Sequence, residues 1–247
     1  MAKRADQQRL EELGLNSSAP PGQLLFDGWL LRLWPGQAKR ARSVNAVYRS
    51  SRPLGDKIAY CERLYASHGL PTIFRITPFS QPPDLDAELA RRAYPRFETT
   101  VVEAATIDPA QRPASVARTL ELAPWVEAVG NLRGSNAVYR QSHLARLQNT
   151  LLPMRALALW HNGAVAATGL TIVEDSWAGL FDIVTDATLR RRGFGEQIVQ
   201  GLLTAAWDMG ARQSYLQASV DNTPARSLYA RYGFQEQYRY WYRGHAN

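Results

Sequence analysis

The second half of the chain alternates between the two periodicities that mark strands and helices. Residues 177–185 are mainly apolar, β-branched or aromatic, which is typical of a buried strand. From Glu196 onward apolar side chains recur at helical spacing, so a helix is expected to follow. Residues 214–220 then alternate as a strand, a helix begins near Asn222, and tyrosines alternate along residues 235–243 as a final strand.

Two helices and a hairpin are predicted ahead of this region. Residues 124–132 and 135–147 have helical spacing. Residues 155–160 and 164–173 alternate as two strands around the turn His161-Asn162-Gly163. The order from residue 124 to the C-terminus is therefore two helices, three strands, a helix, a strand, a helix and a strand.

The first half of the chain predicts a related alternation. The expected elements are a helix at 6–15, a strand at 24–34 that turns at Pro35-Gly36, its antiparallel partner at 41–49, a helix at 56–68, a strand at 72–76, a helix at 85–93 and a strand at 97–104. Residues 108–115 contain two prolines and little apolar content, which is typical of a connection between domains. We therefore divide the chain into domains at 1–105 and 106–247.

Composition excludes several classes of protein. No apolar run approaches the ~20 residues that a membrane span needs, and no apolar signal core follows the N-terminus, so we expect a soluble cytoplasmic protein. The single cysteine, Cys61, excludes an internal disulfide and a cysteine-based metal cluster. No group of His, Asp or Glu has metal-ligand spacing, so no metal is expected. The net charge of +7 comes without a nucleic-acid recognition motif, and we expect no nucleic-acid partner.

A basic, glycine-containing turn separates the strand at 177–185 from the helix that follows it. Its arginines and glycines are Arg190, Arg191, Arg192, Gly193 and Gly195. Glycine lets the backbone turn tightly, and the first N–H groups of a helix have no partner within it. Such a helix start attracts phosphate, and the arginines add to the same field. The turn therefore predicts an anion site.

A second motif follows about thirty residues later. It reads Asn222-x-x-Ala225-x-x-Leu228-Tyr229-x-x-x-Gly233-Phe234. Asn222 is a helix cap with proline in the first turn behind it, and Gly233 ends the helix.

Together the two motifs resemble those of the GNAT superfamily of acyl-CoA N-acyltransferases. The first, Arg190-x-x-Gly193-x-Gly195, is similar to the pyrophosphate-binding signature of that family. The resemblance implies an α/β (α+β) fold, with a mixed, mostly antiparallel, twisted sheet flanked by helices. The first half has the same element order, but residues 50–55 replace the phosphate turn and hold one glycine. We therefore expect a tandem of two GNAT-like units, of which the N-terminal one is degenerate.

The resemblance also implies roles for individual residues. The backbone of the turn would hold the CoA pyrophosphate, the strand end would pair with the pantetheine amides, Asn222 would hydrogen-bond the pantetheine arm, and Tyr229 would protonate the leaving thiolate. The residues expected to contact the cofactor are Ile183, Val184, Thr185, Arg190, Arg191, Arg192, Gly193, Phe194, Gly195, Glu196, Asn222 and Tyr229.

The general base is the least defined part of the site. Members of the family often carry Glu or His at the strand positions that fall here on Gly179 and Phe181, and neither can accept a proton. Asp182 is the acid on that strand. Three roles stay open for it: a base, a water-positioning group or a buried structural acid. His143 and His161 are expected at the surface. Other acids that stay open are Glu98, Glu103, Glu174 and Asp175.

The sequence therefore predicts an acetyl-CoA-dependent N-acetyltransferase in which an amine attacks the thioester directly. Two alternatives stay open: a non-catalytic CoA-binding protein and a basic interaction module. The acceptor is a small-molecule amine or a protein amine, and the protein is a monomer or a homodimer.

Overall fold

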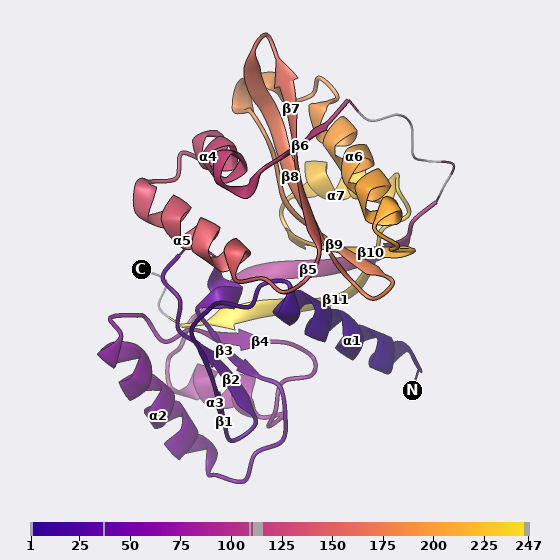
Figure 1. Ribbon diagram of the computed structural model, residues 1–247. Helices are drawn as coiled ribbons and strands as arrows, with labels where there is room; N and C mark the ends of the chain where they lie inside the picture. Colours follow the sequence, from indigo (N-terminus) through magenta and orange to yellow (C-terminus); the bar gives the residue numbers. More distant parts are fainter. Residues whose placement is uncertain (1, 37, 109, 111–115, 245–247) are drawn as a thin grey trace.

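The computed structural model describes residues 2–36, 38–108, 110 and 116–244. These residues form one eleven-stranded sheet with the order β1-β2-β3-β4-β11-β5-β10-β9-β8-β7-β6 (Figure 1). The strands are β1 (Gln23–Phe26), β2 (Trp29–Arg32), β3 (Val44–Ala46), β4 (Phe74–Ile76), β5 (Arg96–Thr106), β6 (Arg118–Leu120), β7 (Met154–His161), β8 (Ala164–Glu174), β9 (Trp177–Thr185), β10 (Gln213–Ser219) and β11 (Gln235–Arg243). The helices are α1 (Ala2–Asn16), α2 (Leu54–Ser67), α3 (Leu85–Arg91), α4 (Leu122–Arg133), α5 (Ala137–Gln148), α6 (Phe194–Asp208) and α7 (Thr223–Ala230).

The pairing pattern repeats once along the chain. Neighbouring strands are antiparallel except for two parallel pairs, β3 with β4 and β9 with β10. A helix crosses over between the members of each pair, α2 in the first half and α6 in the second. This confirms the expected mixed, mostly antiparallel sheet and the similar element order of the two halves.

Strands from the two halves are interleaved in the middle of the sheet. β5 lies between β10 and β11, with Glu103 opposite Leu216 on one side and opposite Glu236 on the other. β11, the last strand of the chain, pairs in turn with β4 of the first half. Each half therefore supplies a strand that satisfies backbone groups of the other, and the sheet runs through the whole molecule without a break.

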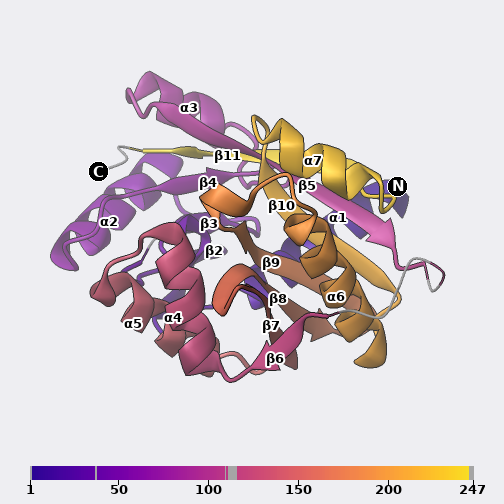
Figure 2. The ribbon, with the colours of Figure 1, turned by 90° about the horizontal axis from the view of Figure 1, so that it is seen from above.

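Helices cover both faces of the sheet in the second half. Side chains of α6 and α7 pack with Leu157 and Leu159 of β7 on one face. Side chains of α4 and α5 pack with Ala156 of β7 and with Leu170 and Ile172 of β8 on the other. Successive residues of a strand point to opposite faces, so both faces are apolar and both are covered (Figure 2).

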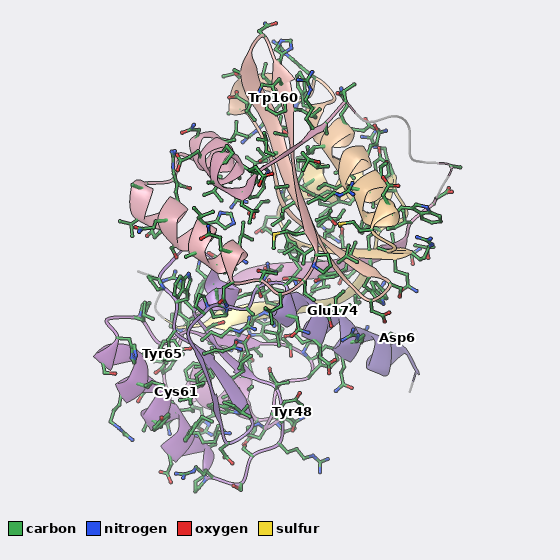
Figure 3. The ribbon with its side chains drawn as sticks, in the orientation of Figure 1. Asp6, Tyr48, Cys61, Tyr65, Trp160 and Glu174 are labelled. Carbon is green, nitrogen blue, oxygen red and sulfur yellow. The ribbon has the colours of Figure 1, made fainter. Side chains whose placement is uncertain are left out.

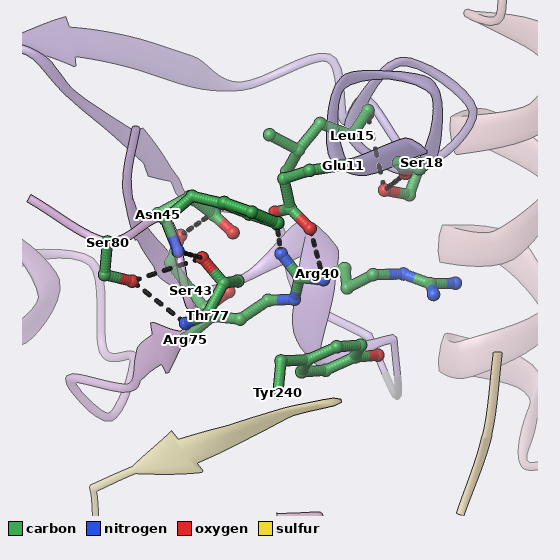
Figure 4. Close-up of polar contacts among 12 residues, drawn as sticks. Glu11, Leu15, Ser18, Arg40, Ser43, Asn45, Arg75, Thr77, Ser80 and Tyr240 are labelled. Carbon is green, nitrogen blue, oxygen red and sulfur yellow. Dashed lines mark hydrogen bonds and ion pairs between the residues drawn. The ribbon is translucent and has the colours of Figure 1, made fainter. Parts of the chain in front are cut away.

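Helix α1 packs across the junction between the halves. Leu10 and Leu13 are buried in a cluster that includes residues of β5, β10 and β11. On the same helix Glu11 forms an ion pair with the buried Arg75 (Figure 4). The Tyr238 hydroxyl donates to Glu11 at 2.7 Å. Farther out, Arg9 lies 3.0 Å from Glu174, which Figure 3 places beside the helix. α1 therefore bridges segments that are distant in sequence.

The structure agrees with most predicted elements and differs at three places. The strand expected at 41–49 is only the short β3, which follows a 3-10 turn at Lys39–Ala41. Residues 24–34, expected as one strand, are the hairpin of β1 and β2, because Asp27 and Gly28 adopt φ of 42° and 83° and reverse the chain. The short edge strand β6 carries too few residues to show a period and was not predicted. The predicted connection at 108–115 falls largely on residues outside those described, since 109 and 111–115 are among them.

The turn before α2 is closed by a side chain of the first half. The carboxylate of Asp27 accepts hydrogen bonds from the backbone N–H groups of Ser51 and Arg52, at 3.1 and 3.0 Å. These bonds, with a smaller contribution from Lys57, hold the pKa of Asp27 well below its usual range. In this half a carboxylate of the chain itself occupies the place of an anion beside the helix start.

Across the described residues no helix is long and apolar enough to cross a membrane, and no cluster of three or more His, Cys, Asp or Glu side chains could hold a metal ion. Cys61 is a free, buried thiol, and burial raises its pKa to about 12. It is therefore a packed side chain of α2 and not a nucleophile.

Candidate active site

The candidate site begins where β9 and β10 separate. The two strands pair in parallel up to Leu180 and Leu216 and not beyond. The β8–β9 register shifts between Thr168 and Leu170, and Asp182, opposite this shift, has a φ of +49°. A bulge of this kind bends the strand that carries it. The bend turns the end of β9 away from β10 and opens a cavity between them.

The cavity has a volume of about 280 Å³ and combines residues from both halves. Its wall includes Ser17, Ser18, Ala38 and Arg40 from the first half, Arg133 and Arg146 from α4 and α5, Phe181, Asp182 and Ile183 from β9, Gln217, Ala218 and Ser219 from β10, and Asn222 and Tyr229 from α7. A smaller hollow of about 70 Å³ shares four of these residues and extends between α4, α5 and the side chains or backbone of Trp34, Gly36, Ala38 and Ala41. The two together form one candidate site.

The predicted anion turn lies at the start of α6. Gly193 has a φ of 83°, in the left-handed region that glycine adopts without strain, and α6 begins at Phe194. Arg191, two residues earlier, also has a positive φ, of 60°. The N–H of Gln197 donates to the carbonyl of Gly193, so the N–H groups just before it have no partner within the helix. Arg190, Arg191 and Arg192 are exposed around this turn. The local geometry is that of an anion-binding helix start.

The end of β9 has one free edge. Val184 and Thr185 pair with Thr168 and Ala167 of β8, whereas β10 pairs with β9 only as far as Leu180. The other edge of residues 183–185 therefore faces the opening between the strands. An extended ligand can add to such an edge through backbone hydrogen bonds.

Helix α7 places two predicted residues in the cavity wall. The Asn222 side chain caps the helix by accepting from the N–H of Ala225 at 3.3 Å. Tyr229 lies two turns farther along the same face and is 7% exposed. Burial and the nearby Glu103 carboxylate raise the pKa of Tyr229 to about 12. Its hydroxyl is therefore protonated at neutral pH.

The sequence matches one protein family over most of its length. The family model described as "Probable histone acetyltransferase Rv0428c C-terminal" matches residues 9–243. The chain belongs to this family. An uncharacterised N-acetyltransferase of Bacillus subtilis, YobR, is 28% identical over 96% of this chain and 98% of its own.

A further relative matches part of the chain, and two solved structures share its fold. The ribosomal protein bS18 alanine N-acetyltransferase of Escherichia coli is 32% identical over 32% of this chain and 53% of its own. A GNAT protein of Kribbella flavida has a TM-score of 0.65 at 15% identity, covering 100% of this chain and 96% of its own. A tandem GNAT protein from the clavulanic acid pathway has a TM-score of 0.64 at 16% identity, covering 100% and 98%. The predicted GNAT fold is confirmed.

Asp182, the acid on the central strand, lies between Arg133 and His143. Its carboxylate lies 2.7 Å from Arg133 and 3.2 Å from His143. Burial alone would raise the pKa of Asp182, but Arg133 and His143 outweigh it and hold the pKa well below its usual range. A carboxylate held this way is a weak proton acceptor. The geometry favours a positioning role over that of a base.

This member departs from the GNAT pattern at Gly179 and Phe181. A Cβ atom at Gly179 would lie 2.5 Å from the Phe181 ring and 2.7 Å from the Tyr215 hydroxyl. The ring therefore fills the space that a Glu or His side chain would need on this strand. Neither Gly179 nor Phe181 supplies a proton acceptor.

The remaining candidate acids lie away from the cavity. Glu174 pairs with Arg9, Glu98 pairs with Lys39, and Glu103 accepts from Arg226 at 2.7 Å beneath α7. Asp175 is an exposed turn residue, and the ring of His161 packs on Phe194. His143, by contrast, was expected at the surface and instead lines the smaller hollow. The site residues without a sequence motif are Ser17, Ser18, Arg40, Arg133, His143, Arg146 and Gln217.

Proposed function

We propose that this protein transfers the acetyl group of acetyl-CoA to an amine. The observation that supports this most is the convergence of four features on one cleft. Ile183 of the free edge, Asn222 and Tyr229 line the cavity between β9 and β10. The anion turn lies next to the end of β9, since a Cβ atom on Gly195 would be 3.4 Å from the Thr185 hydroxyl. Each matches one requirement of acyl transfer from a thioester, and they come from separate segments of the chain.

The turn suits the pyrophosphate of CoA, and the strand edge suits its pantetheine arm. The unpaired N–H groups at the start of α6 would bind the anion, and the exposed Arg190, Arg191 and Arg192 precede them in the same turn. Backbone groups of residues 183–185 would pair with the amides of the arm, which directs the thioester toward Tyr229. Asn222 can donate its amide N–H groups to the arm because its side-chain oxygen is occupied by the helix cap.

The reaction forms a carbon–nitrogen bond and breaks the carbon–sulfur bond of the thioester. A backbone N–H on the free edge of β9 would stabilise the oxyanion that develops on the carbonyl. Tyr229 would donate its proton to the departing thiolate, leaving CoA as a thiol. Burial keeps this hydroxyl protonated until a proton is needed.

The attacking amine has to lose a proton, and His143 is the group that we assign to this task. Its Nε2 lies 3.2 Å from Asp182, and its ring packs on Trp125. Imidazole is the side chain that ordinarily exchanges protons near neutral pH. Asp182 would orient the ring and balance the charge after transfer, which gives this carboxylate a role that does not require it to accept a proton.

Titration calorimetry with acetyl-CoA tests the cofactor site. Gly193→Asp should weaken binding about tenfold or more, because a carboxylate at the helix start repels phosphate. Gly193→Asn is the matched control, since it has the same shape without the charge and asparagine tolerates positive φ. Equal affinity in the Asp and Asn variants would remove the turn from the site, and equal binding of ATP would make it a general anion site.

A non-catalytic CoA-binding protein is the second candidate function. The ring of Phe181 in the place of a strand base favours it. The two functions differ in one respect: both predict acetyl-CoA binding, and only the first predicts release of CoA when an amine is added. The basic interaction module predicts neither selective binding nor turnover.

A further inference from the structure

Positively charged side chains outnumber negatively charged ones around the cavity. Arg40, Arg133 and Arg146 line it, and Asp182 is the one carboxylate among its lining residues that the structure describes. His143 adds a titratable group in the adjoining hollow. The place where an amine would meet the thioester is therefore rich in positive charge.

Asp182 does not balance this charge alone. Arg133 takes its Oδ1 at 2.7 Å, and His143 takes its Oδ2 at 3.2 Å. Each oxygen thus faces a neighbouring side chain, and no carboxylate of the described residues forms an ion pair with Arg40 or Arg146.

Arg146 is a buried guanidinium with one weak hydrogen bond. The residue is 9% exposed, and its Nη1 lies 3.5 Å from the carbonyl of Ser17. No carboxylate among the described residues lies within 4 Å of it. Burial lowers the pKa of Arg146, and Arg40 and Arg133 lower it further, although Asp182 acts in the opposite direction. A buried cation in such surroundings gains strongly from an anion at hydrogen-bonding distance.

Arg40 presents a second guanidinium to the same cavity. It donates to the neutral side chain of Gln217 and lies 5.7 Å from the centre of the Phe181 ring. Figure 4 shows it directed away from the ion pair of Glu11 with Arg75, so that acid is not its partner. Arg40 and Arg146 come from different halves of the chain and both border the space next to Phe181.

We infer that the acceptor is a small amine that carries an anionic group, a carboxylate or a phosphate, and that Arg40 and Arg146 bind this group. The inference rests on the proposed function. The anion fixes one end of the acceptor against the two arginines, which leaves the amine free to reach the thioester near Tyr229. A lysine-rich protein segment would meet repulsion from the same arginines.

Equilibrium binding tests this without requiring turnover. Calorimetry on the full chain saturated with CoA would compare amino acids with their amides, and phosphoethanolamine with ethanolamine. The anionic member of a pair should bind about tenfold or more tightly, since a charge-assisted hydrogen bond is lost in the neutral one. Amidation also lowers the pKa of the amine, so the amide has the larger fraction of unprotonated amine at neutral pH. Tighter binding of the carboxylate therefore cannot be due to a more reactive amine.

Variants assign the preference to the two arginines. Arg146→Gln and, separately, Arg40→Gln should each weaken binding of the anionic amine about tenfold while affinity for the neutral amine and for CoA stays the same. If replacement of the buried Arg146 impairs folding, the Arg40→Gln variant alone still tests the preference. Arg63→Gln, an exposed arginine of α2, controls for net charge.

The outcomes separate this inference from the proposed function. Equal affinity for charged and neutral amines, failure of every anionic amine to bind, or an unchanged ratio in both variants would overturn the inference. Acetyl transfer to neutral amines in that case would leave the proposed function standing. A preference for carboxylates over phosphates, or the reverse, identifies which anion the site holds.

Discussion

Tyr229 and His143 are the two side chains that the account assigns to proton transfer, at opposite ends of the reaction. Tyr229 is buried in the cleft wall and has a pKa of about 12, so it is an acid held ready at neutral pH. His143 lies beside Asp182, where its ring can take the proton of an amine. The two roles use groups whose surroundings differ, one desolvated and one paired with a carboxylate.

Removing either group should affect turnover more than binding. Tyr229→Phe and His143→Gln are each expected to lower kcat about 10²-fold or more, with the affinity for acetyl-CoA within about twofold of the original. Because burial raises the pKa of Tyr229 to about 12, the rate should not fall between roughly pH 8 and 10, where an ordinary tyrosine begins to ionise. Steady-state kinetics against pH measures both.

An unchanged kcat in Tyr229→Phe would show that water or another group protonates the thiolate. An unchanged kcat in His143→Gln would assign the amine proton to solvent. Loss of acetyl-CoA affinity in either variant would point to a structural role and not to proton transfer.

The residues of the site differ in how far the sequence predicts them. Gly193, Asn222 and Tyr229 belong to local motifs, in which spacing alone sets their place on a turn or helix face. Arg40 and Arg146 share no local pattern, because only the packing of the two halves brings them together. The state of Asp182 is likewise set by Arg133 and His143, which come from other elements. Its strand position could be predicted, and its ion pairs could not.

At the scale of elements, the turns before the corresponding helices α2 and α6 differ between the two halves. The turn before α6 presents backbone N–H groups and arginines to a ligand, whereas the turn before α2 is closed by Asp27. The single glycine of residues 50–55 is visible in the sequence, and the loss of the cofactor site from the first half stays a prediction. The sequence did not predict Asp27, because the Asp-Gly turn signal was read as part of one long strand.

Two consequences of the Asp27 contact can be measured. First, calorimetry should give one acetyl-CoA site per chain.

Second, Asp27→Asn should lower stability at pH 7, because the charged carboxylate accepts hydrogen bonds from two backbone N–H groups. The pKa of Asp27 is lowered in the folded state, so its contribution is present above the unfolded pKa and is lost as pH falls below about 4.

Urea unfolding at both pH values tests the second point, with Asp175→Asn as a control. Asp175 is an exposed turn residue that also has positive φ. A loss of stability in Asp27→Asn that is equally large at pH 3 and pH 7 would mean that the charge of Asp27 does not support the turn.

At the scale of the whole molecule, the interleaved strands make the two halves depend on each other. β5 lies on the N-terminal side of the predicted division at residue 105 for most of its length, yet it pairs with β10 and β11. The sequence indicated two similar units from their element order. The exchange of strands between them depends on long-range pairing, which has no local signature. The division itself stays a prediction.

A fragment of residues 106–247 tests this dependence. Without β5, the facing edges of β10 and β11 lose their backbone partners, and the cluster around Tyr238 and Tyr240 loses α1. We expect the fragment to lack a cooperative unfolding transition, whereas the full chain unfolds in one step. Scanning calorimetry of the fragment and of the full chain measures this difference. A fragment that unfolds cooperatively and binds acetyl-CoA would show that the second half folds independently.

The central claim is transfer of an acetyl group to an amine in the cleft between β9 and β10. The most direct measurement is to incubate the full chain with acetyl-CoA and a mixture of anionic and neutral amines, following free CoA thiol and the mass of each amine. The account predicts amine-dependent release of CoA, matched mole for mole by an N-acetylated amine, and a large loss of both in Tyr229→Phe. Binding of acetyl-CoA without any amine-dependent release of CoA would contradict it and leave a CoA-binding protein in its place.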